Sequence, residues 1–287
     1  MVFEEVIFGT AIVGSGVAAA YDLKTTEVPN WLFYVMLAVG VPAVILYSIL
    51  SAGLETLALS AATGFGLLGL GYLMYRFGQW GGADAVLLAI IGFLMSSVSG
   101  LFPGDIAFPF GLSFLFNLFI IGAVYMVVYA AIFAMRNRTV LENFKSNMAK
   151  STKIFAVLCI AMTVVFSGLM FYLGSLVGGF TVDEMVRGIT LPVALTIAFM
   201  VIYKFAKVVE NYGFKTKIPV SKLKVGDMLL DEKKLVGITQ LQVNRIRKSR
   251  KKYVWIKDGV RFVPAFPLAL LFTLYIGDAI LLIRLLF

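Results

Sequence analysis

The chain is predicted to be an all-α polytopic membrane protein with about eight transmembrane helices and a small cytoplasmic α+β module before the last helix. Three observations predict this fold class. Of its 287 residues, 60% are hydrophobic and 14% are charged, and the mean hydropathy is +0.94, which is far from the composition of a soluble domain. Long apolar runs recur along the whole sequence. A basic, water-facing segment at residues 206–262 precedes the final run.

The apolar runs are each expected to be a helix. A hydrocarbon core of about 30 Å takes roughly 20 helical residues to cross. Backbone groups cannot stay unpaired in lipid, and the alternating pattern of a membrane β-barrel is missing from the sequence, so helices are the remaining solution. The runs lie at residues 3–21, 32–51, 57–77, 86–102, 110–135, 154–173, 187–205 and 263–283.

The basic residues predict the orientation in the membrane. If the N-terminus lies outside, all 25 Lys and Arg residues except Arg187 and Arg284 fall in cytoplasmic segments. We therefore expect a multi-pass protein of the plasma membrane with an outside N-terminus. Trp31 and Trp80 are expected at the cytoplasmic interface, where indole rings are favoured.

Four parts of the chain follow from this pattern. Residues 1–135 are expected to form an N-terminal core with five transmembrane helices, and residues 136–205 a basic cytoplasmic loop and two further transmembrane helices. Residues 206–262 form the basic cytoplasmic module and residues 263–287 the C-terminal transmembrane helix. In the module we expect an extended piece around residues 218–230, a helix from Thr239 to Lys248 capped by Thr239, and a strand at Tyr253–Ile256.

The charge of this module indicates its partner. Its excess of Lys and Arg, held at the membrane, is expected to contact anionic lipid headgroups. Nucleic acid is not expected as a partner, because the basic run at residues 245–252 lacks the interleaved aromatic side chains on which bases stack.

The absence of certain residues from the sequence excludes several chemistries. The chain has no histidine, which excludes a Ser-His or Cys-His nucleophile and an HExxH zinc site. Its one cysteine, Cys159, forms no disulfide within the chain and no CxxC zinc site. A Walker A sequence is also missing. No metal or cofactor is expected, so any catalysis must depend on carboxylates.

Two aspartates predicted on the cytoplasmic side are the candidate catalytic residues. Asp22 closes the first run and is followed by Pro29 and Asn30, whereas Asp84 directly follows the sequence Gly81-Gly82-Ala83. Either aspartate alone is readily explained as an ordinary helix-end residue. Together, on one predicted side of the membrane, they favour a functional pair. Pro29 and Asn30 are expected to start the next helix.

Two carboxyl groups that share one proton can hydrolyse a peptide bond, because one activates water and the other polarises the carbonyl. Asp84 at the amino end of its helix favours the anion and Asp22 at a carboxyl end favours the protonated form, which would make Asp84 the base. Such a pair titrates as a unit, so the assignment stays open. Glu27 either contacts a basic substrate segment or is a solvated loop acid. Asp278 interrupts the last run, where we expect a packing or interfacial role.

The Asp22 segment with Val28-Pro29-Asn30, and the Gly-Gly-Ala-Asp sequence that opens a later helix, resemble the type IV prepilin peptidases, which are membrane aspartic proteases with a GxGD-type motif. The resemblance covers residues 15–95. In addition, Ile218-Pro219-Val220, Val225-Gly226-Asp227 and the sequence at residues 259–266 resemble the C-terminal part of archaeal preflagellin and prepilin peptidases.

This resemblance implies an aspartic endopeptidase with Asp22 and Asp84 as catalytic residues. Its substrates would be archaellin or pilin-like precursors, which lose a short basic leader peptide at the cytoplasmic membrane edge. Ala83 stands where the family pattern has its second glycine, and it keeps a small residue there. The cysteine-rich insertion of the methylating members is missing from the sequence, so no methyltransferase activity is expected.

Three alternative functions remain open. A presenilin-like intramembrane protease shares the Tyr21-Asp22 fragment but places its aspartates in later helices. A cation-coupled transporter uses acidic residues nearer the midplane and shows repeat symmetry. A structural scaffold would tolerate Asn at both positions.

Overall fold

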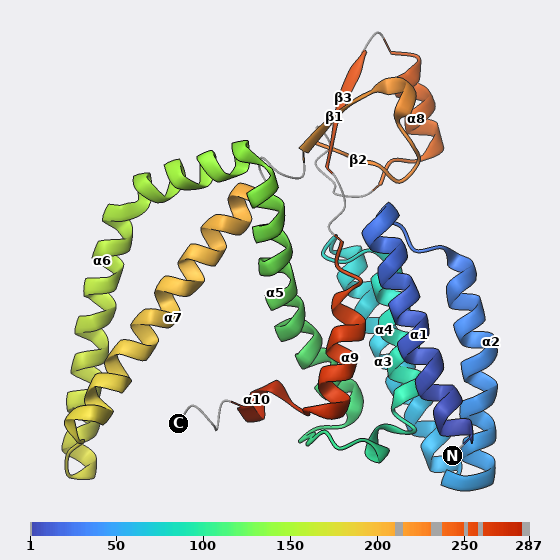
Figure 1. Ribbon diagram of the computed structural model, residues 1–287, viewed down its shortest axis with the longest axis horizontal. Helices are drawn as coiled ribbons and strands as arrows, with labels where there is room; N and C mark the ends of the chain where they lie inside the picture. The colour runs from blue at the N-terminus through green and yellow to red at the C-terminus, as the bar shows by residue number, and fades with distance from the viewer. Residues whose placement is uncertain (1, 210–214, 231–236, 250–251, 258–260, 283–287) are drawn as a thin grey trace. The chain divides into compact units, whose positions relative to one another are not determined.

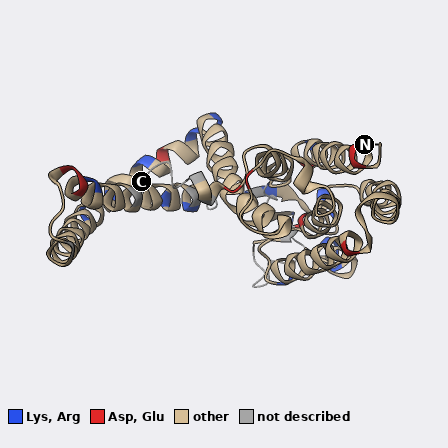
Figure 2. Cartoon of the chain, turned by 90° about the horizontal axis from the view of Figure 1, so that it is seen from below, with Lys and Arg blue, Asp and Glu red and all other residues tan. Residues whose placement is uncertain are grey.

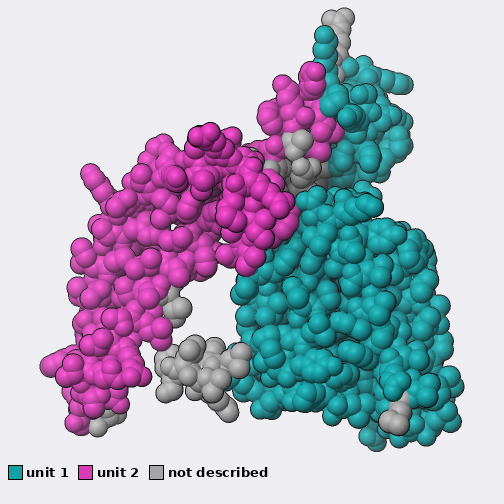
Figure 3. All heavy atoms as spheres, in the orientation of Figure 1, with its two compact units in different colours: residues 1–126, 219–252, 258–287 teal, residues 127–218, 253–257 magenta. Residues whose placement is uncertain are grey.

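The computed structural model describes residues 2–209, 215–230, 237–249, 252–257 and 261–282. The chain divides into two compact units, shown in different colours in Figure 3. The first unit comprises Met1–Met126, Pro219–Lys252 and Asp258–Phe287, and the second comprises Val127–Ile218 and Tyr253–Lys257.

The first unit is a helical assembly (Figure 1). Its membrane part consists of α1 (Val2–Thr25), α2 (Asn30–Tyr47), the π-helical turn η1 (Ser48–Ala52), α3 (Leu54–Arg76), α4 (Gly82–Met95), the 3₁₀ turn η2 (Ser99–Leu101), the first part of α5 (Phe110–Arg136), α9 (Ala265–Tyr275) and α10 (Ala279–Leu282). Charged residues are sparse along these helices (Figure 2), as expected for segments that face lipid.

Helix α4 lies at the centre of this unit. It packs against α1, α2 and α3, and most of its residues are buried. Leu87, Leu88 and Ile91 of α4 belong to the same apolar core as Met36 of α2 and Phe266 of α9. A side chain at the start of α4 is therefore held by the whole core, because every neighbouring helix restrains this one.

The chain is a membrane protein. Among the described residues, six helices are long and apolar enough to cross a bilayer: Val2–Thr25, Asn30–Ala52, Leu54–Arg76, Phe110–Arg136, Arg138–Leu176 and Val182–Phe205. The two other predicted runs correspond to shorter apolar helices, Gly82–Met95 and Ala265–Tyr275. The expected total of eight membrane-spanning helices stays a prediction.

The last apolar run differs from the expected single helix, because it breaks at Gly277. This glycine has a φ of +99°, which an L side chain rarely adopts. Polar contacts connect the break to the rest of the unit. Asp278 Oδ2 accepts a hydrogen bond from the Ala107 N–H at 2.7 Å. The Asn117 amide donates to Thr273 Oγ1 and to the Gly277 carbonyl, at 2.9 Å each. Asp278 thus joins the break to the chain between α4 and α5.

The second unit contains the end of α5, α6 (Arg138–Val177), α7 (Val182–Val208), the strand β3 (Tyr253–Lys257) and all but the last residue of the strand β1 (Lys215–Pro219). Helices α6 and α7 pack against each other, and Phe144 and Phe205 make an edge-to-face ring contact at 5.2 Å. Residues 138–153, which we expected in a loop, are helical. Asn137 starts this helix by accepting a hydrogen bond from the Val140 N–H, and no glycine or proline interrupts the segment.

The expected elements between α7 and α9 are present in the described residues. The predicted helix is α8 (Gln240–Arg247), capped by Thr239, whose hydroxyl accepts from the Gln242 N–H. The predicted strand is β3, which neighbours β1 in a small sheet. The expected extended piece contains a two-residue strand, β2 (Met228–Leu229), and the 3₁₀ turn η4 (Val220–Lys222). Residues 210–214, 231–236, 250–251 and 258–260 of the predicted module lie outside the described residues.

Candidate functional site

Asp22 lies in the last turn of α1 and is buried, with 5% of its surface exposed. Its Oδ2 accepts a hydrogen bond from the Val263 N–H at 3.1 Å, across 241 positions of sequence. The cationic side chain of Arg261 also interacts electrostatically with Asp22. The end of α1 is thus joined to the segment that leads into α9, which sequence reasoning did not place at this site.

Asp84 is the third residue of α4 and is also buried. Its Oδ2 accepts a hydrogen bond from the Gly81 N–H at 2.9 Å, so this carboxyl group closes the amino end of the helix. In the part of the chain that the structure describes, Asp84 Oδ1 is buried and has no hydrogen-bond partner. This oxygen remains available to a substrate or a water molecule.

The residues before Asp84 fit this turn closely. Gly81 has an extended backbone with φ −73° and ψ 158° and precedes the helix, which begins at Gly82. A Cβ at Gly81 would lie 3.2 Å from Asp84 Oδ2, which is closer than ordinary van der Waals contact. Ala83 is half-buried and packs against the core of the first unit. Small residues therefore allow the Asp84 carboxyl group to fold back over the helix start.

The two aspartates are brought to one place. Helix α1 packs against α4, and Asp22 is close enough to Asp84 to act on it electrostatically. Each carboxyl group keeps a different partner, since Asp22 accepts from Val263 and Asp84 from Gly81. Two buried carboxyl groups in such proximity can act as a general base and a general acid on one substrate.

The loop between α1 and α2 holds the other predicted site residues. Pro29 caps α2 with φ −71°, and Asn30 is the first helical residue, as expected for a proline at a helix start. The loop leaves α1 through Thr26, whose φ is +59°, and Thr25 Oγ1 donates to the Glu27 carbonyl at 2.9 Å. The Glu27 side chain is exposed, and the interactions of the described residues do not join it to either aspartate.

Trp80 links the Asp84 turn to the segment before α9. Its ring centroid lies 6.3 Å from that of Phe262 and 6.4 Å from that of Phe266, and 5.8 Å from that of Phe119 in α5. Trp80 is half-buried in the core, whereas Trp31 is exposed and contacts Tyr21 edge-to-face. Trp80 therefore packs beside the Asp84 turn, and its expected position at the membrane interface stays a prediction.

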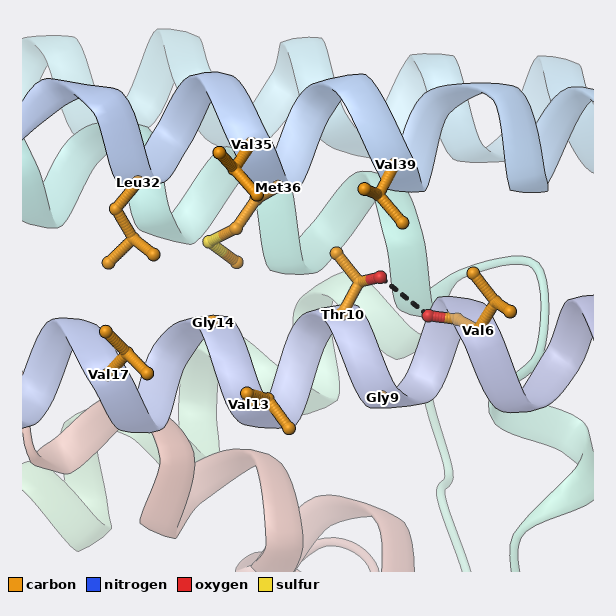
Figure 4. A pocket seen from close by; sticks show the side chains of 10 residues that line it. All are labelled: Val6, Gly9, Thr10, Val13, Gly14, Val17, Leu32, Val35, Met36 and Val39. Carbon is orange, nitrogen blue, oxygen red and sulfur yellow. Dashed lines mark hydrogen bonds between the residues drawn. The ribbon is translucent and has the colours of Figure 1, made fainter.

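An apolar groove with a volume of about 410 Å³ runs between α1 and α2 (Figure 4). Thr10 brings a hydroxyl group to the lining, but this group is used by a 2.7 Å hydrogen bond to the Val6 carbonyl. The lining residues are Val6, Gly9, Thr10, Val13, Gly14 and Val17 of α1 and Leu32, Val35, Met36 and Val39 of α2. The lining of this groove contains no acidic or basic side chain, so the groove offers no acid–base group.

Metal ligands are not grouped in the part of the chain that the structure describes: three or more Cys, Asp or Glu side chains do not converge there, and the sequence has no histidine. Cys159 is a free thiol in α6.

Part of the chain matches the model of one protein family. Residues 10–135 match the model of the type IV leader peptidase family, and both aspartates lie inside this range. No curated protein matches the chain. Arg261 and Val263, which contact Asp22, lie outside the matched range. The resemblance of residues 259–266 to archaeal relatives was the one sequence signal near them, and it carried no indication of a contact with α1.

Proposed function

Because residues 10–135 match the model of the type IV leader peptidase family, we propose that this chain is an aspartic endopeptidase that acts on prepilin-like precursors, with Asp22 and Asp84 as its catalytic pair. One observation carries this proposal. Two carboxyl groups separated by 62 positions in sequence are both buried in the first unit, where α1, which carries Asp22, packs against α4, which carries Asp84. Burying two acids together is costly, and such pairs concentrate at functional sites.

The proposed reaction needs only these two groups and water. One carboxylate takes a proton from water, whose oxygen attacks the carbonyl carbon of the scissile peptide bond, while the carboxyl group of the other aspartate protonates the carbonyl oxygen. The tetrahedral intermediate then collapses: the C–N bond breaks, the first aspartate returns its proton to the leaving amine, and the second regains its proton from a hydroxyl group. Both aspartates end in their starting states.

The proposed substrates are archaellin or pilin-like precursors, which carry a short basic leader followed by an apolar helix. Support comes from the family and from the predicted orientation, which puts Asp22 and Asp84 at the cytoplasmic edge of the plasma membrane. At this edge a bond just before a transmembrane helix is reached without unwinding that helix. The exposed carboxylate of Glu27 is suited to contact a basic leader.

Further parts of the proposal follow the sequence. We assign residues 1–135 to the peptidase core, residues 136–205 and 263–287 to accessory membrane segments, and residues 206–262 to a basic module that contacts anionic lipid headgroups and not nucleic acid. The chain belongs on this proposal to the archaeal preflagellin and prepilin peptidase branch and carries out proteolysis without methyl transfer.

The test is cleavage of a co-expressed pilin-like precursor by the wild type, by Asp22→Asn and by Asp84→Asn. General acid–base catalysis contributes about 10²- to 10⁴-fold per group, so each variant should lose at least about 100-fold in rate. Asp105→Asn is the matched control, because Asp105 is an exposed carboxylate in the loop before α5 and should leave cleavage unchanged. Membrane insertion of each variant is measured alongside.

Normal cleavage by either Asn variant would overturn the assignment of the pair, and activity of both would favour a structural scaffold. If the wild type cleaves within an apolar helix and leaves the basic leader attached, the presenilin-like alternative is correct. If the wild type fails to cleave and instead moves protons or cations across vesicles in an aspartate-dependent manner, the transporter alternative is correct.

A further inference from the structure

The segment that leads into α9 contacts Asp22, although it lies outside the part of the chain that matches the peptidase family. Val263 is buried and donates its N–H to Asp22 Oδ2 at 3.1 Å, and Arg261, two residues earlier, adds a positive charge near the same carboxyl group. Chain positions far from the matched residues thus supply both a donor and a cation to one member of the pair.

The position of this segment is fixed from two sides. Phe262 contacts the Trp80 ring, and Trp80 lies just before the Asp84 turn. On the other side, a Cβ at Gly122 of α5 would lie 2.8 Å from a Phe262 ring carbon, so only a glycine allows this close approach. The segment is therefore packed between α5 on one side and Trp80, just before α4, on the other. This packing holds Arg261 and Val263 in place beside Asp22.

The two carboxyl groups have different surroundings as a result. Burial disfavours the charged form of both carboxyl groups, but Asp22 accepts one backbone hydrogen bond and feels the charge of Arg261, both of which oppose this effect and favour a carboxylate. Asp84 accepts one backbone hydrogen bond at Oδ2, whereas its Oδ1 is buried without a partner in the described residues, which favours a proton on this oxygen. The contacts therefore oppose the assignment that the helix-end argument alone suggested.

We propose that Arg261 is a positioning residue that, with the Val263 N–H, keeps Asp22 as the carboxylate, so that Asp22 is the general base and Asp84 the general acid. This inference rests on the proposed function. Asp22 takes the proton of the attacking water, and Asp84 donates its proton to the carbonyl oxygen. When the C–N bond breaks, Asp22 passes its proton to the leaving amine and Asp84 regains one from the hydroxyl group of the intermediate.

The charged groups around Asp22 determine how its protonation affects the pH dependence of the cleavage rate. Arg261 acts on Asp22 from the segment before α9, and Asp22 in turn acts on Asp84 at the start of α4. Lys24 and Glu27, on its own helix end and the following loop, are exposed and screened by solvent. Removal of the Arg261 charge should thus make Asp22 easier to protonate and leave the remaining groups in place.

The experiment is the pH dependence of the cleavage rate, per inserted enzyme molecule, for the full-length protein with a purified pilin-like precursor in vesicles. Arg261→Gln should move the acidic limb of the profile up by about one pH unit. Arg261→Lys should restore most of the wild-type limb, because it keeps the charge. Lys150→Gln is the control: it removes an exposed cation in α6, outside the lipid-contacting module, and should leave both limbs unchanged.

The outcomes separate this inference from the function on which it rests. If the wild type does not cleave the precursor, the proposed function itself fails. If the wild type cleaves and Arg261→Gln shifts only the basic limb, Asp22 is the acid and the inference is wrong. A uniform loss of rate without a shift of either limb, in Arg261→Gln and Arg261→Lys alike, would show a purely structural residue and would also overturn it.

Discussion

Gly71 in α3 sets how closely α3 approaches the start of α4. A Cβ at this position would lie 2.8 Å from Ala85 Cα and 2.9 Å from Ala85 Cβ, and Ala85 directly follows Asp84. The first of these atoms is backbone, which cannot swing away as a flexible side chain does. Gly71→Ala therefore has to widen this contact from 2.8 Å to at least the 3.4 Å of ordinary van der Waals contact, and the start of α4 moves with it.

The change in the free energy of unfolding caused by Gly71→Ala is the difference between two opposing contributions. Overpacking costs about 1–3 kcal/mol, whereas Ala in place of Gly stabilises a helix by about 1 kcal/mol. The net loss of up to about 2 kcal/mol should still allow folding and insertion. Displacement of a catalytic group by about 1 Å costs roughly 100-fold in rate, so a displacement of about half that size should slow cleavage roughly tenfold.

The assay is the initial rate of precursor cleavage per inserted enzyme molecule. Gly69→Ala is the control on the same helix, because a Cβ there meets nothing within 4 Å, and its rate should equal that of the wild type. If Gly71→Ala cleaves as fast as Gly69→Ala, then close packing of α3 against α4 does not position Asp84, and the reasoning is refuted.

Three further predictions concern stability. Asn117→Ala should lower the free energy of unfolding in detergent by about 2–4 kcal/mol. The reason is that Asn117 is buried and makes three hydrogen bonds around the α9–α10 break, one of them from the Ala279 N–H. An unchanged thermal midpoint would contradict this expectation. Trp80→Ala should lower the free energy of unfolding by about 3 kcal/mol, since each of its three ring contacts is worth about 1 kcal/mol. Trp80→Phe keeps an aromatic ring at this position and should therefore lose less of this stability. Thr239→Ala should destabilise α8 by about 1 kcal/mol, measured as faster amide exchange within that helix, while Gln240→Ala, whose side chain makes no cap, should have a smaller effect.

The sequence was a good guide wherever the signal is local. Apolar runs predicted the membrane helices, Thr239 predicted the start of α8, and Pro29 predicted the start of α2, because capping and proline geometry act over a few residues. Local signals were less reliable at helix ends. Residues 138–153 were expected in a loop because they are charged, yet charged residues with good helical propensity extend α6 past its apolar part.

The sequence by itself determined the membrane class, the exclusion of histidine and zinc chemistry, and the choice of Asp22 and Asp84 as candidates, since composition and short motifs carry all three. The tertiary structure decided which groups surround them. Arg261 and Val263 approach Asp22 across about 240 positions only because Trp80, Phe262 and Gly122 pack the final segment between α4 and α5. Such contacts depend on the three-dimensional fit of helices, which no periodicity or local motif encodes.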